Sequence, residues 1–231
     1  MIKSLFPEEA CWKLTPSDLV FLWEECKRCF YLKLVDHFDR PRMAMPKIFT
    51  VIDSKMKDCL INERTERISS QLPSGIVKFG EKWIESKPIS LKNHSTSCYI
   101  RGKLDAVVAF DDGSYGVIDF KTSRPSAAHA DVYFKQLNAY AYSLQNAALG
   151  KLSLSPVTRL GLLIFEPELF VHNGGGSATM AGSLSWIEVR QDPQVFLRLL
   201  DNVLDVLERV EAPEADPECG WCNYLKRGVQ A

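Results

Sequence analysis

Two carboxylates and a lysine stand close together in the middle of the sequence. Asp105 ends the run G-K-L-D, and after a turn over residues 111–114 the run V-I-D-F-K contains Asp119 and Lys121. If residues 117–121 form a strand, Asp119 and Lys121 point to the same face, because side chains alternate along a strand. Carboxylate oxygens hold hard divalent cations such as Mg²⁺, and a lysine can stabilise charge that develops on a phosphate group. These residues predict metal-assisted hydrolysis of a phosphodiester bond.

The neighbours of Asp119 favour this interpretation. Acids near a hairpin turn are common, so the D-x-K spacing is weak by itself. Here the acid stands among Val117, Ile118 and Phe120, which is typical of a buried strand. Charged side chains are rarely buried unless they are paired or bound to a metal ion. The setting therefore indicates a functional role for Asp119.

The run G-K-L-D-A-V-V, the turn and the run V-I-D-F-K-T-S resemble the PD-(D/E)XK nuclease superfamily, and most of all its RecB-type and Cas4-like branch. That branch has a following Q-x-x-x-Y element, which Gln136 and Tyr140 match. The resemblance extends over about residues 15–224. It implies that the catalytic residues are Asp105, Asp119, Lys121, Gln136 and Tyr140.

The resemblance also implies the ligands of a catalytic Mg²⁺ or Mn²⁺ ion. Asp105, Asp119 and the carbonyl group of Phe120 would bind the ion. In relatives, a helix before the first strand supplies a further His or Glu. The helix expected over residues 49–70 contains no His, and Asp53 is the best substitute. An exposed helix carboxylate without a functional role is an equal expectation for Asp53.

The cysteines carry a second signal. Four of the seven form two C-x-x-C pairs, Cys26 with Cys29 and Cys219 with Cys222. No signal peptide is recognisable, so a reducing compartment and free thiols are expected. Two such pairs predict a four-thiolate site for zinc or an iron–sulfur cluster, which would join an N-terminal helix to the C-terminal tail. The remaining three are expected to be small buried hydrophobic residues: Cys11, Cys59 and Cys98.

The family resemblance implies a [4Fe-4S] cluster at this site, with Zn²⁺ as the alternative. Cas4-like nucleases usually have one cysteine before the nuclease core and three after it. Here the division is two and two. This departure leaves the identity of the metal open.

Composition sets the wider limits. The chain has 231 residues and 46% hydrophobic residues, which suits one domain over residues 1–231. The formal net charge of −1 gives no general support to nucleic-acid binding. A basic stretch from Lys27 to Lys57 could follow a phosphate backbone, although an ordinary solvated face is equally expected. Candidate DNA-binding residues are Lys27, Arg28 and Lys33 in this stretch, and Arg124 in a loop over residues 122–126.

Hydrophobic periodicity predicts the elements that position these residues. Helices are expected over about residues 16–33, 49–70, 130–149 and 195–210, and the first of these would place Cys26 and Cys29 on one helical face. Strands are expected over residues 98–110, 115–121, 159–166 and 185–190. Residues 75–79 and 83–89 are expected to form either short strands or an irregular segment before the first of these strands. Loops are expected over residues 40–46 and 172–177. Together with these elements, the family resemblance implies an α/β fold, a restriction-endonuclease-like mixed sheet flanked by helices, with the two ends of the chain joined by the cysteine site.

The expected function is that of a metal-dependent deoxyribonuclease, a Cas4- or RecB-like exonuclease acting on single strands or DNA ends. RNA as the substrate stays open. Two alternatives also stay open: a nucleic-acid-binding module that cannot cut, and a partner-dependent subunit of a repair, phage or CRISPR-adaptation complex. No segment is apolar enough to cross a membrane, and a cytoplasmic location is expected.

Overall fold

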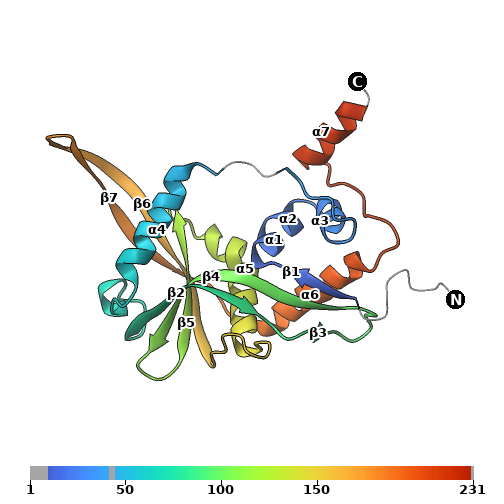
Figure 1. The fold of residues 1–231 in the computed structure, drawn as a ribbon, viewed down its shortest axis with the longest axis horizontal. Coiled ribbons are helices and arrows are strands. Elements are labelled where there is room, and N and C mark those ends of the chain that lie inside the picture. The colour runs from blue at the N-terminus through green and yellow to red at the C-terminus, as the bar shows by residue number, and fades with distance from the viewer. Residues whose placement is uncertain (1–9, 42–44, 230–231) are drawn as a thin grey trace.

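The computed structural model describes residues 10–41 and 45–229 (Figure 1). The strands of this part of the chain form one sheet in the order β1-β4-β5-β6-β7, and β2 and β3 also pair with β4. The strands are β1 (Cys11–Leu14), β2 (Gly75–Glu85), β3 (Ile89–Ser90), β4 (Ser97–Phe110), β5 (Tyr115–Thr122), β6 (Val157–Gly174) and β7 (Ser177–Glu188). The helices are α1 (Pro16–Val20), α2 (Leu22–Glu25), α3 (Lys27–Leu34), α4 (Lys47–Leu60), α5 (Ala128–Gln145), α6 (Pro193–Leu207) and α7 (Gly220–Val229), with a 3₁₀ helix η1 (Thr65–Arg67).

The sheet is mixed, as predicted. Strands β4 and β5 form an antiparallel hairpin, whereas β5 and β6 run parallel and are connected by α5. Strand β1 is also parallel to β4. Parallel neighbours need a crossover connection, and α5 is that connection between β5 and β6. The α/β fold class with a mixed sheet flanked by helices is therefore confirmed.

Helices cover both faces of the central strands. On one face, Met56 and Leu60 of α4 belong to a buried cluster with Ile118 and Phe120 of β5. On the other face, α5 packs on Val117 and its neighbours through residues such as Leu137. The alternation of side chains along β5 thus directs Asp119 and Lys121 toward α5. Figure 1 shows α4 and α5 on either side of these strands.

The N-terminal helical region differs from its prediction. The start is confirmed, because the side chain of Thr15 caps α1 by accepting a hydrogen bond from the Asp18 N–H group. The single helix expected over residues 16–33 is instead three short helices. Cys26, between α2 and α3, has an extended backbone with φ −164° and ψ 113°, which a continuous helix does not permit.

Other boundaries also differ from those predicted. Helix α4 ends at Leu60, well before residue 70, and β2 is one continuous strand over the range in which two pieces were expected. Strand β1 and helix α7 were not predicted. The predicted loop over residues 172–177 is the turn of a long β6–β7 hairpin that projects from the body of the molecule (Figure 1). Residues 42–44 of the predicted loop over residues 40–46 lie outside the described residues.

Among the helices of the described chain, none has the length and apolar character needed to cross a lipid bilayer.

Candidate active site

The two predicted metal-binding acids lie where β4 and β5 separate. The β4–β5 ladder ends with the pair of Ala106 and Ile118. Asp105 and Asp119 occupy the next position, where the two strands are no longer paired. Beyond this pair the backbone N–H group of Phe120 donates to the Asp105 carboxylate instead, at 3.0 Å. The side chain of Asp105 thus satisfies a backbone group that the sheet has released. The separation of the strands leaves polar groups at this point of an otherwise apolar sheet.

Gly102, which opens the G-K-L-D run, allows two helices to approach this part of β4. A Cβ atom at position 102 would lie 2.8 Å from the Pro16 ring in α1 and 3.4 Å from the Tyr140 ring in α5. The first distance is shorter than a carbon–carbon contact permits. Glycine at this position therefore lets α1 pack directly on β4, beside the Tyr140 ring of α5.

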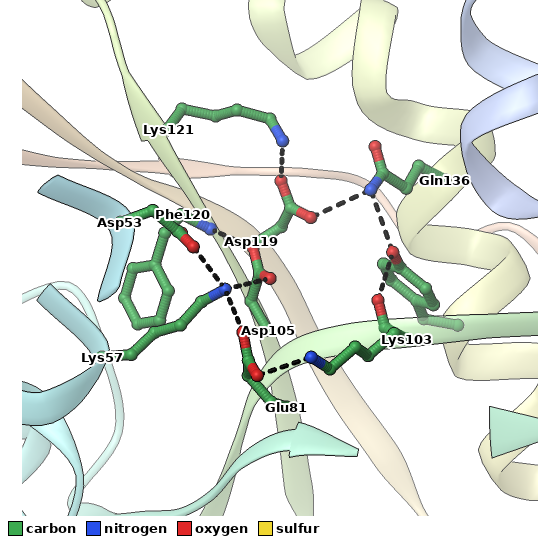
Figure 2. Close-up of polar contacts among 10 residues, drawn as sticks. Asp53, Lys57, Glu81, Lys103, Asp105, Asp119, Phe120, Lys121 and Gln136 are labelled. Atoms are coloured by element: carbon green, nitrogen blue, oxygen red, sulfur yellow. Dashed lines mark hydrogen bonds and ion pairs between the residues drawn. The ribbon is translucent and has the colours of Figure 1, made fainter. Parts of the chain in front are cut away.

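Asp119 is buried, and Figure 2 shows its carboxylate between Gln136 of α5 and Lys121. Its carboxylate accepts a hydrogen bond from the Gln136 side-chain amide at 2.9 Å and forms an ion pair with Lys121. The same amide nitrogen lies 3.0 Å from the Tyr140 hydroxyl group, which donates to the carbonyl oxygen of Lys103 at 3.1 Å. The structure thus brings the D-x-K and Q-x-x-x-Y residues into one connected network.

Burial controls the ionisation of this network. It raises the pKa of Asp119 to about 6; the ammonium group of Lys121 opposes this rise, and the Asp105 carboxylate adds to it. Burial alone would lower the pKa of Lys121, but Asp119 raises it above its ordinary value. The ring of Tyr133 lies under Lys121, with 4.6 Å between its centroid and the Nζ atom. Tyr133 was not among the predicted site residues, although it stands in the same helix as Gln136.

Lys57 of α4 is the main residue that the sequence did not reveal (Figure 2). Its Nζ atom lies 2.8 Å from a carboxylate oxygen of Asp105, 2.7 Å from Asp53 and 3.2 Å from Glu81. Burial alone would lower the pKa of Lys57, but its hydrogen bonds to Asp105 and Asp53 raise it. The only sequence signal for Lys57 is its position four residues after Asp53, on the same helical face.

Glu81 faces Asp105 across the β2–β4 pair, between the pairs of Gly80 with Ala106 and Lys82 with Leu104. Its φ angle is +47°, a left-handed conformation that is uncommon for a residue with a side chain. Its carboxylate contacts both Lys57 and Lys103. Strained backbone of this kind is found at functional sites in other proteins, and nothing in the sequence pattern indicated it.

The carboxylate oxygens of this site are not as close together as the ligands of a bound metal ion. In residues 10–41 and 45–229, the only group with three or more ligand atoms within 4.8 Å of one another is the cysteine cluster. Asp53 reaches Asp105 through Lys57 rather than directly. The donors nevertheless suit a hard divalent cation, since they are carboxylate oxygens, and the buried Gln136 Oε1 atom has no hydrogen-bond partner. A bound ion at Asp105 would have to share its carboxylate with Lys57.

The predicted cysteine site is assembled. All four sulfur atoms lie within 4.8 Å of one another and are buried. Cys29 lies 3.4 Å from Cys222 and 3.9 Å from Cys219, and Cys26 lies 3.9 Å from Cys222. The cluster thus joins the N-terminal helices to the C-terminal segment, as predicted. Of the other cysteines, Cys98 is buried as predicted, but Cys11 and Cys59 are exposed.

Each C-x-x-C pair stands at the N-terminus of a helix. Cys26 and Cys219 precede α3 and α7, and Cys29 and Cys222 lie in the first turns. The prediction that Cys26 and Cys29 share one helical face is therefore wrong, because Cys26 is extended. Burial opposes ionisation of Cys26, but hydrogen bonds from backbone groups of Asp216 and Cys29 lower its pKa to about 7. Arg40 donates to the Cys219 sulfur at 3.1 Å. Burial instead raises the pKa of Cys29 and of Cys222, so in the metal-free cluster Cys26 is the cysteine shifted toward the thiolate, the form that binds a metal.

The four predicted DNA-binding residues have different surroundings. Lys27 lies over the Trp23 ring, and Arg28 donates to the carbonyl oxygen of Pro213 at 3.1 Å. Lys33 pairs with Asp18 at 2.8 Å. The side chain of Arg124 is 90% exposed, with one weak ion pair to Glu166 at 3.9 Å. Arg124 is thus the most available of the four, and DNA binding by all four stays a prediction.

Comparison with known proteins identifies the family. The sequence profile of the PD-(D/E)XK nuclease superfamily matches residues 59–227, which is most of the chain. The chain belongs to the PD-(D/E)XK nuclease superfamily. A solved structure of a protein named SSO0001 is similar at 16% identity, with a TM-score of 0.48, over 93% of this chain and 84% of that chain. No curated protein matches the sequence.

Membership of the superfamily indicates a metal-dependent nuclease that hydrolyses phosphodiester bonds in a nucleic acid. The profile covers Asp105, Asp119 and Lys121, together with the second cysteine pair. It begins after Lys57 and the first cysteine pair.

Proposed function

We propose that this nuclease of the PD-(D/E)XK superfamily acts on DNA, with Mg²⁺ or Mn²⁺, as a RecB- or Cas4-like exonuclease on single strands or ends. The observation that carries the proposal is the connected network of Asp119, Lys121, Gln136 and Tyr140, placed where β4 and β5 separate. A buried carboxylate, a lysine and a positioned amide in one place are more than a structural ion pair requires.

Each residue of the network has a role that follows from its contacts. Asp105 and Asp119, with the Phe120 carbonyl group, would hold the divalent ion, which supplies a Lewis acid for the phosphate and lowers the pKa of water. Gln136 holds the Asp119 carboxylate in one orientation by donating to it. Lys121 lies beside Asp119 and can turn its ammonium group to the attacking water or to a phosphate oxygen. Tyr140 fixes Gln136 relative to β4.

Proposed contacts to the substrate lie beyond this network. The exposed guanidinium group of Arg124 stands three residues after Lys121, in the loop that leaves β5. A guanidinium group at this position can bind a phosphate of the strand in the site. Lys27, Arg28 and Lys33 would extend the contact only by leaving their present intramolecular partners, which makes Arg124 the strongest candidate.

The cysteine cluster is proposed to hold a structural metal centre. Tetrahedral zinc, with zinc–sulfur bonds of about 2.3 Å, requires sulfur atoms roughly 3.8 Å apart. Three of the sulfur pairs here are separated by 3.4 to 3.9 Å, and all four sulfur atoms lie within 4.8 Å of one another. A [4Fe-4S] cluster places irons and sulfides between the cysteines and needs wider spacing. The spacing therefore favours one Zn²⁺ ion over the iron–sulfur cluster that the family resemblance implied.

Metal analysis of anaerobically purified protein distinguishes these two centres. One zinc per chain without visible absorption supports zinc, whereas four irons with the broad absorption of an iron–sulfur cluster would overturn this assignment. The double variant Cys219→Ser/Cys222→Ser should lose the metal and unfold at a lower temperature, because binding of a structural metal contributes to folding free energy. Cys59→Ser, an exposed cysteine outside the cluster, is the matched control.

Nuclease activity is tested with end-labelled single- and double-stranded DNA in Mg²⁺ or Mn²⁺ against EDTA. Lys121→Ala and Asp119→Asn should abolish cleavage, and Lys92→Ala, an exposed lysine in the β3–β4 connection, should not. Persistent cleavage by Asp119→Asn at equal purity would refute the site. The product pattern separates exonuclease from endonuclease action, and an RNA strand tests substrate class.

A second candidate function is a nucleic-acid-binding or partner-dependent subunit that does not cut by itself. The observation that favours it is the position of Lys57. Its ammonium group occupies the space among three carboxylates that a divalent metal ion would otherwise fill. Binding of DNA without cleavage, in protein that folds and carries its cysteine-bound metal, would support this candidate. Cleavage that begins only on addition of a partner protein would identify the partner-dependent form.

A further inference from the structure

The ammonium group of Lys57 lies at the centre of the acidic side of the site. Three carboxylates, those of Asp53, Glu81 and Asp105, surround its Nζ atom at 2.7 to 3.2 Å (Figure 2). The lysine side chain is only 11% exposed. A lysine on the surface of a helix normally pairs with one acid and keeps its head in water. Contact with acids from a helix and two strands is the arrangement that a bound cation would produce.

The charges in this region show why a cation is needed there. Four carboxylates lie in the site: Asp53, Glu81, Asp105 and Asp119. Three lysines, Lys57, Lys103 and Lys121, contact them. Without Lys57, the first three carboxylates would keep only Lys103, which contacts Glu81. Carboxylates gathered around one point repel one another strongly where water is partly excluded.

Lys57 also holds Asp105 in its present orientation. One Asp105 oxygen contacts Lys57 at 2.8 Å, and the other accepts the hydrogen bond from the Phe120 N–H group at 3.0 Å. Asp119 is turned to the opposite side, toward Gln136 and Lys121. The two acids that would share a metal ion are therefore each engaged by a different lysine.

We propose that Lys57 is a built-in counter-ion that competes with the divalent metal for Asp105. In metal-free protein its ammonium group contacts Asp53, Glu81 and Asp105 together and offsets part of their negative charge. When the metal binds at Asp105, Lys57 moves away from this carboxylate and stays with Asp53 and Glu81. Occupancy of the metal site is thereby set by a competition between a fixed monovalent and a diffusible divalent cation. This inference rests on the proposed metal-dependent function.

The strained conformation of Glu81 fits this role. The left-handed φ angle of +47° directs the Glu81 carboxylate to the ammonium groups of Lys57 and Lys103 together. With an ordinary φ angle, side chains along the strand would continue to alternate between the two faces of the sheet. The ion pairs of Glu81 with Lys57 and Lys103 help to offset the cost of this conformation. Glu81 therefore gives Lys57 a second anchor after Asp105 is released.

Direct titration with Mn²⁺, followed by the electron paramagnetic resonance signal of the free ion, tests the competition without measuring activity. Lys57→Met removes the ammonium group and keeps the length of the side chain. This variant should bind Mn²⁺ at least about tenfold more tightly than the wild type, which corresponds to about 1.4 kcal/mol. The matched control is Lys103→Met, which removes the same charge from the same cluster but does not free Asp105; its affinity should stay within about threefold of wild type.

Asp105→Asn shows whether the titrated ion is at this site, since it should abolish binding. If the wild type binds Mn²⁺ in this way and Lys57→Met binds it equally or more weakly, the competition is refuted and the metal site stands. If neither protein binds Mn²⁺, both the competition and the metal-dependent function are refuted. Tight binding by Lys57→Met alone would support the competition in its strongest form.

A measurement on the wild type covers the case in which Lys57→Met does not fold. Nitrogen-15 resonances of lysine ammonium groups are observable when the groups are held in ion pairs, and Lys57→Arg assigns the resonance of Lys57. Saturation with Mg²⁺ should shift this resonance and leave that of Lys33, which pairs with Asp18, unchanged. A Lys57 resonance that Mg²⁺ does not shift would refute the displacement.

Discussion

At the scale of single residues, burial controls the ionisation of Asp119. It is 2% exposed, and its pKa is raised to about 6 by burial. A carboxylate that titrates near neutrality binds a metal only when the pH is high enough to ionise it. Gln136 favours the ionised form by donating a hydrogen bond to it at 2.9 Å. If Asp119 binds the metal as proposed, the loss of this hydrogen bond should be visible in the pH dependence of cleavage.

We predict that Gln136→Met lowers cleavage at neutral pH by about tenfold to a hundredfold, because a hydrogen bond to a charged group contributes roughly 1.5 to 3 kcal/mol. Without the donor the pKa of Asp119 rises further, so the acid limb of kcat/KM should move to higher pH. The measurement is the pH profile of kcat/KM at a fixed, subsaturating concentration of Mg²⁺.

Asn146→Ala is the control, because Asn146 carries an exposed amide at the end of the same helix. An unchanged acid limb in Gln136→Met would show that the amide does not act on Asp119. Equal losses at all pH values would indicate a structural defect.

At the level of elements, side-chain contacts hold the connection between β3 and β4 against α6. His94 in this connection contacts Asp201 of α6 at 2.9 Å and Glu208, just after α6, at 3.3 Å. Glu208 also accepts hydrogen bonds from the backbone N–H group of Thr96 at 2.7 Å and from its hydroxyl group at 2.8 Å. Burial alone would lower the pKa of His94, but its hydrogen bonds to the two acids raise it above 6.5. The contact therefore depends on pH.

We predict that this contact stabilises the protein at low pH and less so at high pH. A histidine whose pKa is higher in the folded than in the unfolded state adds stability below its unfolded pKa, about 6.5. The contribution disappears as the pH rises through the folded-state pKa. Below about pH 6.5, the free energy of unfolding of the wild type should exceed that of His94→Gln by up to about 1 kcal/mol. The difference should shrink as the pH rises through the folded-state pKa of His94.

Urea unfolding at a series of pH values gives this difference directly. His172→Gln, in the exposed β6–β7 hairpin, is the matched control and should follow the wild type at every pH. A difference between wild type and His94→Gln that grows with pH would show that the histidine stabilises the fold in its neutral form instead.

At the scale of the whole molecule, the β6–β7 hairpin is an arm that adds little to the core. Its outer part exposes large apolar side chains, with Leu169 58%, Phe170 70% and Met180 45% exposed. The base of the hairpin is different, since Trp186 is 7% exposed and packs over Gly161. A Cβ atom at position 161 would lie 2.3 Å from the Trp186 ring, so the base is tightly packed.

We predict that replacing residues 168–181 by a two-residue turn leaves the fold intact. The free energy of unfolding should change by less than about 1 kcal/mol, because substitutions that lose no buried contact have small effects. Shortening an exposed apolar edge should also reduce aggregation. Circular dichroism and denaturant unfolding give the comparison.

Trp186→Ala, at the base of the same hairpin, should cost about 3 to 5 kcal/mol and serves as the contrast. If the shortened protein lost as much stability as Trp186→Ala, the arm would be part of the cooperative core.

Local sequence patterns account for a large part of this protein. Asp119 and Lys121 had to share a face because strand side chains alternate, and Gln136 and Tyr140 had to be neighbours because helical side chains four apart are close. The two C-x-x-C pairs predicted a four-thiolate cluster because short spacing lets two thiols turn to one point. The strand and helix relations, and the spacing within each cysteine pair, depend on residues a few positions apart, whereas the two pairs lie 190 or more positions apart and were joined because a metal site needs four ligands. The sequence was therefore sufficient for the α/β class, the grouping of these polar residues and the cysteine cluster.

Tertiary structure decided what depends on distant segments. Lys57 lies among acids from α4, β2 and β4, and no local pattern could place Glu81 opposite Asp105 with a left-handed backbone. The break at Cys26 follows from its place in a cluster with the C-terminal segment, which overrides the helical pattern around it. Asp53 reached the site, but as the partner of a lysine. An ion pair forms between residues that are close in space, whereas local sequence patterns show only which residues are close along the chain.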